Sequence, residues 1–306
     1  MSGAALGRIA PERLIDPKVL ARVGNLELLA RRVVEGFVSG LHRAAHLGTS
    51  TDFAEHRAYV PGDDIRRIDW RVFARTDRLY VKTFEAQTNA DLVVALDSSA
   101  SMNYPDQGVT KFDYARYMAA TLVYLGARQR DRVGLIAFAD DVVEMTPPAT
   151  RHRDKILRQL ADLKPEGRGS LLEGLKRIVP RLSRRGILVV ISDFYEPTHD
   201  VVRALDEIRL RGHDVLVLHP IARTERDFDL GQATIVEELE TQQRMPVLPA
   251  QIAGEYRALI SAHLQTLERE CGARDIDYAT FPIEDPLDAV LFHYLSRRAR
   301  LGKTRR

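Results

Sequence analysis

Asp97, Ser99 and Ser101 place one carboxylate and two hydroxyls at alternate positions, directly after the apolar run Leu92 to Leu96. A short apolar run of this kind predicts a buried strand, and the polar residues mark where the chain leaves it. Carboxylate and hydroxyl oxygens are the ligands that hard divalent cations prefer. The spacing therefore predicts a cation site at the end of this strand.

Two later segments supply further oxygen ligands. Gly167-Arg168-Gly169-Ser170 opens a helical run, and Val189 to Asp193 is a second apolar strand that ends in a carboxylate. Because ligands of open parallel sheets bind beyond the carboxyl ends of the strands, we expect Asp97 and Asp193 at one site. Two carboxylates balance a divalent ion, Mg²⁺ or Mn²⁺, and leave a coordination position for water or for a partner's carboxylate.

Taken in order, these segments resemble the metal-ion-dependent adhesion site (MIDAS) of von Willebrand factor type A domains. In that pattern a DxSxS loop, a loop Thr and a strand-end Asp hold one divalent ion. The matching metal ligands are Asp97, Ser99, Ser101, Ser170 and Asp193. Ser170 departs from the family's Thr, since it keeps the hydroxyl but lacks the methyl group that restricts its rotamer. The alternative interpretation of the first motif is an ordinary helix N-cap, for which Asp and Ser are equally suited.

Composition indicates a globular, cytoplasmic protein. The chain has 306 residues, 45% of them hydrophobic, and Cys271 is its single cysteine, which excludes an internal disulfide framework. No stretch approaches the ~20 apolar residues that span a bilayer, and the N-terminus lacks the apolar centre of a signal peptide. The net charge of +2 gives no general attraction for nucleic acid.

Basic residues do gather at the C-terminus, where they form either a solvated tail or a site for an anionic partner. They are Arg297, Arg298, Arg300, Lys303, Arg305 and Arg306.

From Asp91 onward, predicted strands and helices alternate. This pattern predicts an α/β fold, a von Willebrand A-like doubly wound, mainly parallel sheet with helices on both faces. The strands are expected at residues 91–97, 132–139, 187–193, 214–219 and 276–281. The helices are expected at residues 111–129, 151–163, 170–183, 198–211, 251–271 and 286–298.

Two segments of this region leave the simple alternation. Val142 to Met145 is expected to return as an antiparallel edge strand, a common variation on such sheets. Residues 222–251 predict either a small hairpin, built from Thr234 to Glu240 and Met245 to Leu248, or a mobile loop. The expected domains are therefore 1–89 and 90–306, the second with a possible hairpin insertion near 222–250.

The first 89 residues predict helical segments, one starting at Asp16-Pro17 and one over Leu26 to Val38, and then a polar insert. The insert resembles the signature of the bacterial domain-of-unknown-function family 58 (DUF58), which precedes a von Willebrand A-like core, as here. The residues that carry the resemblance are Gly48, Asp52-Phe53, Arg57, Tyr59, Gly62-Asp63-Asp64, Arg66, Ile68-Asp69-Trp70, Ala74-Arg75 and Leu79 to Glu85.

This resemblance implies a bacterial protein encoded beside MoxR-type AAA+ ATPases, which it helps to act on client complexes. The charged and aromatic side chains of the insert have two interpretations. They form either an ion-pair web that pins a loop, or a recognition surface for the ATPase, since Arg and Trp dominate interface energies. The partner-binding candidates are Arg57, Asp64, Arg66, Asp69, Trp70 and Arg75.

These observations favour a non-enzymatic adaptor whose divalent ion grips an acidic residue of a partner protein, with a MoxR-type ATPase as that partner by resemblance. The alternative is a metal-dependent hydrolase that uses Asp97 and Asp193. Nucleic-acid binding through the arginine-rich tail is a third interpretation.

A hydrolase needs a base beside the ion, and His199 is the only histidine close in sequence to either Asp97 or Asp193. It is expected to face solvent. His42 and His46 have the i, i+4 spacing of a zinc pair, but no third ligand follows nearby. The motifs GxSxG, GxxxxGK[ST] and GxGxxG are absent, so serine hydrolase, P-loop and dinucleotide chemistry have no sequence support.

Overall fold

The computed structural model describes residues 25–35, 56–58, 80–82, 90–106, 108–182, 184–229 and 234–291. Contacts divide the chain into two compact units, Val38–Thr88 and the remainder. The structure has a helix at residues 26–35. The expected boundary at residue 89 assigned this helix to the same domain as the insert. That helix instead groups with the sheet, because Leu29 and Val33 are fully buried and Glu27 lies 3.7 Å from Arg153.

Within the unit Val38–Thr88, the structure describes β1 (His56–Ala58) and β2 (Tyr80–Lys82), which pair antiparallel. β2 falls inside the strand expected at Leu79 to Phe84. Arg57 has a described backbone only. Other predicted features lie outside the described residues, namely Asp64, Arg66, Asp69, Trp70, Arg75, the helix start at Asp16-Pro17, the pair His42 and His46, and the basic C-terminus.

The larger unit contains a six-stranded sheet in the order β12-β9-β8-β3-β6-β7. Its strands are β3 (Asp91–Asp97), β6 (Arg132–Phe138), β7 (Val142–Ala149), β8 (Ile187–Ile191), β9 (Asp214–Ile221) and β12 (Asp277–Pro282). Five run parallel, and β7 lies antiparallel to β6 at one edge. The doubly wound sheet and its antiparallel edge strand are thus confirmed.

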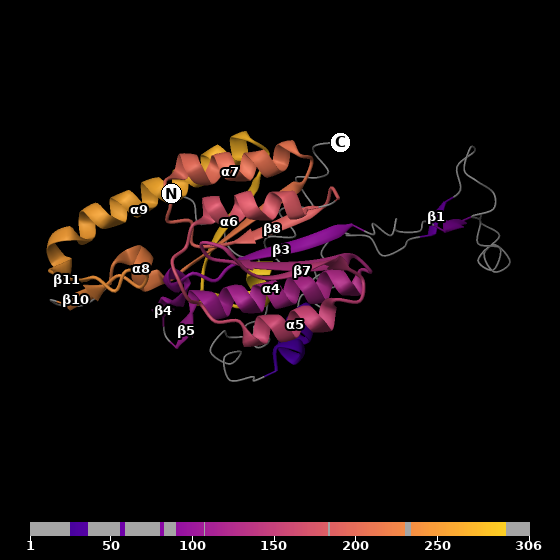
Figure 1. The fold of residues 1–306 in the computed structure, drawn as a ribbon, viewed down its shortest axis with the longest axis horizontal. Coiled ribbons are helices and arrows are strands. Elements are labelled where there is room, and N and C mark those ends of the chain that lie inside the picture. Colours follow the sequence, from indigo (N-terminus) through magenta and orange to yellow (C-terminus); the bar gives the residue numbers. More distant parts are fainter. Residues whose placement is uncertain are drawn as a thin grey trace. The chain divides into compact units, whose positions relative to one another are not determined.

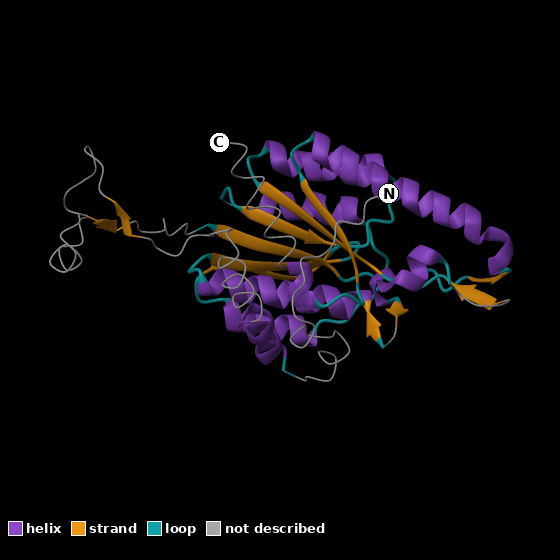
Figure 2. Cartoon of the chain, turned by 180° about the vertical axis from the view of Figure 1, so that it is seen from behind, coloured by secondary structure: helices purple, strands orange, loops and turns teal. Residues whose placement is uncertain are grey.

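Helices cover both faces of this sheet (Figure 1 and Figure 2). One face carries α4 (Lys111–Arg128) and α5 (Arg153–Asp162), and the other carries α6 (Leu171–Ile178), α7 (Thr198–Leu210) and α9 (Pro249–Ala273). β3 is buried along its whole length, with Val93 and Ala95 in the core shared with α6, α7 and α9. Burial on both faces explains why its sequence is continuously apolar rather than alternating.

Proline sets two helix boundaries that differ from expectation. The helix expected over residues 170–183 gives way to the 3-10 turn η4 (Val179–Arg181), because Pro180 has no N–H for the helical ladder. α9 begins earlier than expected, at Pro249, whose fixed φ suits the first turn. The helix expected at 286–298 is described only through residue 291. In the described part of the chain, no helix is long and apolar enough to cross a membrane.

Short elements gather around the carboxyl ends of the parallel strands (Figure 1). They are η3 (Ala100–Asn103), β4 (Pro105–Asp106), β5 (Val109–Thr110), α8 (Arg223–Asp227), β10 (Thr234–Glu237) and β11 (Arg244–Val247). β10 and β11 pair as an antiparallel hairpin, so of the two expectations for residues 222–251 the hairpin is the one found.

Candidate functional site

The first loop of the site follows β3. Ser98 ties the loop to β6, because its N–H and its hydroxyl both donate to the Phe138 carbonyl, at 2.7 and 3.0 Å. The N–H of Ser99 donates to Oδ1 of Asp97 at 2.9 Å, and the hydroxyls of Ser99 and Ser101 lie 3.0 Å apart. The Ser99 side chain does not cap η3. The loop therefore gathers one carboxylate and two hydroxyls, and the N-cap alternative does not describe Ser99.

The second loop is held against the first by backbone hydrogen bonds. Glu166 N–H donates to the Ser98 carbonyl, and Ala100 N–H donates to the Gly167 carbonyl, both at 2.9 Å. Gly169 then passes so close that a Cβ placed on it would lie 2.7 Å from Cβ of Ser99. Only glycine allows this approach without displacement of the first loop.

Ser170 follows directly and caps α6, since its hydroxyl accepts from the N–H of Glu173 at 3.3 Å. It is not among the residues that line the adjacent cavity. The structure thus shows Ser170 in the N-cap role, while its role as a metal ligand stays a prediction.

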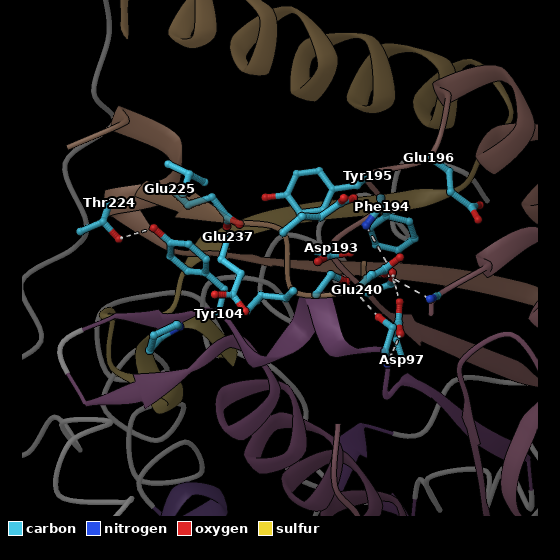
Figure 3. Close-up of a pocket in the computed structure, with 18 of the residues that line it drawn as sticks. Asp97, Tyr104, Asp193, Phe194, Tyr195, Glu196, Thr224, Glu225, Glu237 and Glu240 are labelled. Carbon is cyan, nitrogen blue, oxygen red and sulfur yellow. Dashed lines mark hydrogen bonds between the residues drawn. The ribbon is translucent and has the colours of Figure 1, made fainter. Parts of the chain in front are cut away.

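The end of β8 provides the third part of the site. The hydroxyl of Ser192 donates to Oδ2 of Asp97 at 2.6 Å and accepts from the N–H of Phe194 at 3.2 Å. Phe194 has φ of 49°, in the left-handed region that is rare for a bulky residue. Its ring packs on His219, at 5.3 Å between centroids. This bend brings Asp193 to the same cavity as Asp97 (Figure 3).

Burial of Asp97 makes its negative charge costly. The side chain is 4% exposed, and burial, together with the nearby charge of Asp193, raises the pKa of Asp97 to about 7. Hydrogen bonds from Ser192 and Ser99 act in the opposite direction. A cation bound beside the two carboxylates would favour the ionised form of Asp97 and so lower this pKa.

Lys111 is a cation that sequence reasoning missed. It is fully buried at the start of α4, and its Nζ lies 2.8 Å from Asp193 and 3.0 Å from Glu225. Burial lowers the pKa of Lys111, but Asp193 and Glu225 outweigh this and raise it. One signal was present, because lysine in the first turn of a helix opposes the macrodipole and needs a compensating partner.

Glu240 was also missed. It lies between β10 and β11, and its Oε1 accepts from the N–H of Gly169 at 3.1 Å. Burial raises the pKa of Glu240 and the charge of Asp193 adds to this, whereas hydrogen bonds from Gly169 and Ser101 lower it. Figure 3 shows Glu240 beside Asp97 and Asp193. Nothing in its local sequence indicates this position, since Glu237, Glu238 and Glu240 have the same character.

These groups form one end of a cavity of about 650 Å³. On the side of the predicted ion site, the lining residues are Asp97, Ser99, Ser101, Gly169, Ser192 and Asp193. The rest of the lining includes the aromatic and apolar side chains Tyr104, Tyr195, Phe228, Tyr256, Ile235 and Leu239, together with the carboxylates of Glu196, Glu225, Glu237 and Glu238. The cavity opens at the boundary between β3 and β8, where successive connections depart to opposite sides of the sheet. Ligands of doubly wound sheets bind at this switch point.

Two of the predicted ligand oxygens have the spacing that a small divalent cation requires. Ligands at about 2.1 Å on neighbouring corners of an octahedron lie about 3.0 Å apart. The hydroxyls of Ser99 and Ser101 have this separation of 3.0 Å. Over the described residues, no group of three or more His, Cys, Asp and Glu is arranged to hold a metal ion. An ion here would consequently depend on the hydroxyls as well as on Asp97 and Asp193.

The described cavity lining includes no histidine that could serve a hydrolase as base. His199 lies in the first turn of α7 with its side chain 80% exposed, as expected. The available bases are carboxylates, and each glutamate of the lining already has a partner. Glu225 is bonded to Lys111, and Glu196, Glu237, Glu238 and Glu240 accept from Leu172, Arg244, Thr241 and Gly169. The hydrolase alternative would need one of these glutamates to leave its partner.

Comparisons with known proteins gave one family and several more distant matches. The family described as "Protein of unknown function DUF58" matches residues 55–264, about two thirds of the chain. The uncharacterized protein Mb1516 of Mycobacterium bovis is 29% identical over 268 residues, which cover 84% of each chain.

Among solved structures, BatB from Bacteroides thetaiotaomicron is 16% identical, with a TM-score of 0.46 over 69% of this chain and 99% of its own. The SpRpn10 VWA domain is 13% identical, with a TM-score of 0.44 over 66% of this chain and 93% of its own.

Proposed function

The chain belongs to the DUF58 family, as its polar insert predicted, and we propose that it is a non-enzymatic protein-interaction module. In this proposal, one divalent ion, Mg²⁺ or Mn²⁺, binds between Asp97, Asp193 and the hydroxyls of Ser99 and Ser101, with the hydroxyl of Ser170 as the fifth predicted ligand. The ion keeps a coordination position for the carboxylate of a partner protein. When bound, it supplies a positive charge that an acidic side chain can reach from the cavity.

The observation that carries the proposal is the charge balance of the buried groups around this end of the cavity. Asp97, Asp193 and Glu225 are each at most 9% exposed, and Lys111 supplies one positive charge to Asp193 and Glu225. When all three carboxylates are ionised, two negative charges remain uncompensated among these four side chains. Unpaired buried charges are strongly unfavourable, and a divalent cation supplies the missing charge.

A MoxR-type AAA+ ATPase is the partner that we propose. The family membership supports this choice through the resemblance of the polar insert, whose candidate contacts are Arg57, Asp64, Arg66, Asp69, Trp70 and Arg75. In this arrangement the ion site holds an acidic residue, and the insert provides a second contact. A pull-down from the native host with and without EDTA identifies the partner, and a MoxR-type ATPase captured only without EDTA is the expected result.

Thermal unfolding with Mg²⁺ or EDTA tests the ion itself. At 100 times its dissociation constant, Mg²⁺ should add ~2.7 kcal/mol to the free energy of unfolding. Asp97→Asn should abolish this gain, yet leave the metal-free protein about as stable, because it removes a costly buried charge. Asp154→Asn, at an exposed carboxylate of α5, should keep the gain.

Identical unfolding of the wild type in Mg²⁺ and in EDTA would show that the site binds no ion. Hydrolysis of a phosphoester or peptide that is lost in EDTA would favour the hydrolase alternative instead.

A further inference from the structure

The β10–β11 hairpin places one carboxylate, that of Glu240, against the second loop of the predicted ion site. Most of its side chains face solvent, including Ile235 at 68% and Met245 at 66% exposure. Glu237, Glu238 and Glu240 all line the cavity, but Glu237 and Glu238 are exposed, whereas Glu240 is half-buried. The hairpin thus contacts the site through an acidic residue. The proposed function expects a residue of this type from the partner protein.

The contact of Glu240 joins parts of the chain that are far apart in sequence. Its Oε1 accepts from the N–H of Gly169, 71 residues away, at 3.1 Å. A Cβ on Gly169 would lie 3.2 Å from the same oxygen and 2.7 Å from Cβ of Ser99. The carboxylate therefore lies against the loops that carry the predicted ligands, although the neighbouring charge of Asp193 repels it.

We propose that Glu240 is an internal ligand of the ion site, so that the hairpin occupies the place of the partner's acidic residue until the partner displaces it. This inference rests on the proposed function and names its regulation. The attraction between the ion and Glu240 offsets the repulsion from Asp193, so ion binding and hairpin attachment stabilise each other.

The two strands of the hairpin are joined by bonds of their own. Within it, Arg244 pairs with Glu237 at 2.7 Å, and the N–H of Glu238 donates to the carbonyl of Gln243 at 2.9 Å. These bonds hold the two strands together and do not depend on the ion site. Displacement of Glu240 therefore breaks a bond to Gly169 and leaves the hairpin itself paired.

The same geometry defines the partner's chemistry. Glu240 follows Leu239, and both line the cavity, whose lining also includes the rings of Tyr104, Tyr195 and Tyr256. A partner segment that replaces the hairpin tip should carry an acidic residue next to an apolar one. The acidic residue binds at the ion, and the apolar residue packs among the tyrosine rings.

Hydrogen exchange of the hairpin amides, together with Mn²⁺ titration, tests the proposal on the full chain. Mn²⁺ should slow exchange of residues 234–247 in the wild type but not in Glu240→Gln. The variant should bind Mn²⁺ about 5-fold to 150-fold more weakly, the usual range of coupling between two sites. Glu238→Gln is the matched control, because Glu238 accepts from the Thr241 hydroxyl within the turn, and it should behave as the wild type.

Two further arms separate the possible failures. Acetate should speed hairpin exchange in the Mn²⁺-loaded wild type by competing with Glu240, and chloride at the same ionic strength should not. If the wild type binds no Mn²⁺, the proposed function fails and this inference fails with it. If Mn²⁺ binds but exchange and affinity are the same in the wild type and Glu240→Gln, the inference alone is overturned.

Discussion

Nζ of Lys111 lies 2.8 Å from Oδ2 of Asp193, and the two side chains are 0% and 6% exposed. The lysine begins α4 and the aspartate follows β8, so the ion pair fastens a helix to the end of a strand 82 residues away. Glu225 accepts a second bond from the same ammonium group, and the ring centroid of Tyr195 lies 4.6 Å from it. Lys111 is therefore a fixed positive charge behind Asp193, Glu225 and Tyr195, which line the cavity.

Replacement of Lys111 should be strongly destabilising. Lys111→Met leaves Asp193 and Glu225 buried without their counter-charge, and loss of one member of a buried pair costs about 3–5 kcal/mol. Lys176→Met should cost less than about 1 kcal/mol, because the Lys176–Glu173 pair is half exposed. Urea unfolding in EDTA measures both, and Mg²⁺ should recover part of the loss in Lys111→Met. If Lys111→Met were no less stable than Lys176→Met, the buried ion pair would not be what stabilises this site.

Substitutions of Ser170 separate its observed cap from its predicted role as a ligand. Ser170→Ala removes the acceptor for the Glu173 N–H and should cost about 1 kcal/mol in EDTA. It should also weaken Mg²⁺ binding, whereas Ser170→Thr keeps the hydroxyl and should preserve both properties. Calorimetry with Mg²⁺ checks the binding. Unchanged affinity in Ser170→Ala would leave Ser170 as a helix cap only.

Gly169→Ala should damage the contact between the two loops. The added Cβ would lie 2.7 Å from Cβ of Ser99, and such overpacking costs about 1–3 kcal/mol. It should also displace the Ser99 hydroxyl and reduce stabilisation by Mg²⁺. Gly254→Ala in α9 is the control, because its Cβ meets no atom within 4 Å, and alanine favours the helix by up to about 1 kcal/mol. Equal melting temperatures for the two variants would contradict the close approach.

His219 should make the protein sensitive to acid. Burial lowers the pKa of His219 to about 3, against an ordinary value of 6.5, and Lys111 and His263 lower it further while Asp193 raises it. Below pH 6.5 the unfolded chain binds a proton that the folded chain does not, so stability falls as the pH falls toward 3. At pH 5 the loss from this residue is about 2 kcal/mol relative to pH 8.

Urea unfolding at pH 5 and pH 8 measures this contribution. His219→Gln can still bond the Tyr278 hydroxyl, which lies 2.8 Å from Nδ1 of His219, but it does not titrate and should lose this part of the pH dependence. The exposed control His199→Gln should keep it. A pH dependence that is the same in both variants would show that His219 takes up its proton without unfolding.

The sequence by itself determined the framework of the larger unit. The continuous apolar runs at Leu92 to Leu96 and Val189 to Ile191 predict strands buried on both faces, and β3 and β8 are such strands. Alternation with helices then fixes a parallel sheet whose carboxyl ends meet at one edge. Asp97 and Asp193 could be assigned to one site for this reason, since Asp97 ends β3 and Asp193 follows β8 after Ser192.

Only the tertiary structure decided which other charges meet these two aspartates. Lys111 reaches Asp193 across 82 residues, and Glu240 reaches Gly169 across 71. No repeating pattern in the local sequence predicts either contact. The position of a side chain at the start of a helix or at the tip of a hairpin depends on how that element packs. Periodicity reports which face of an element is buried, whereas the meeting of side chains from separate elements depends on three-dimensional packing.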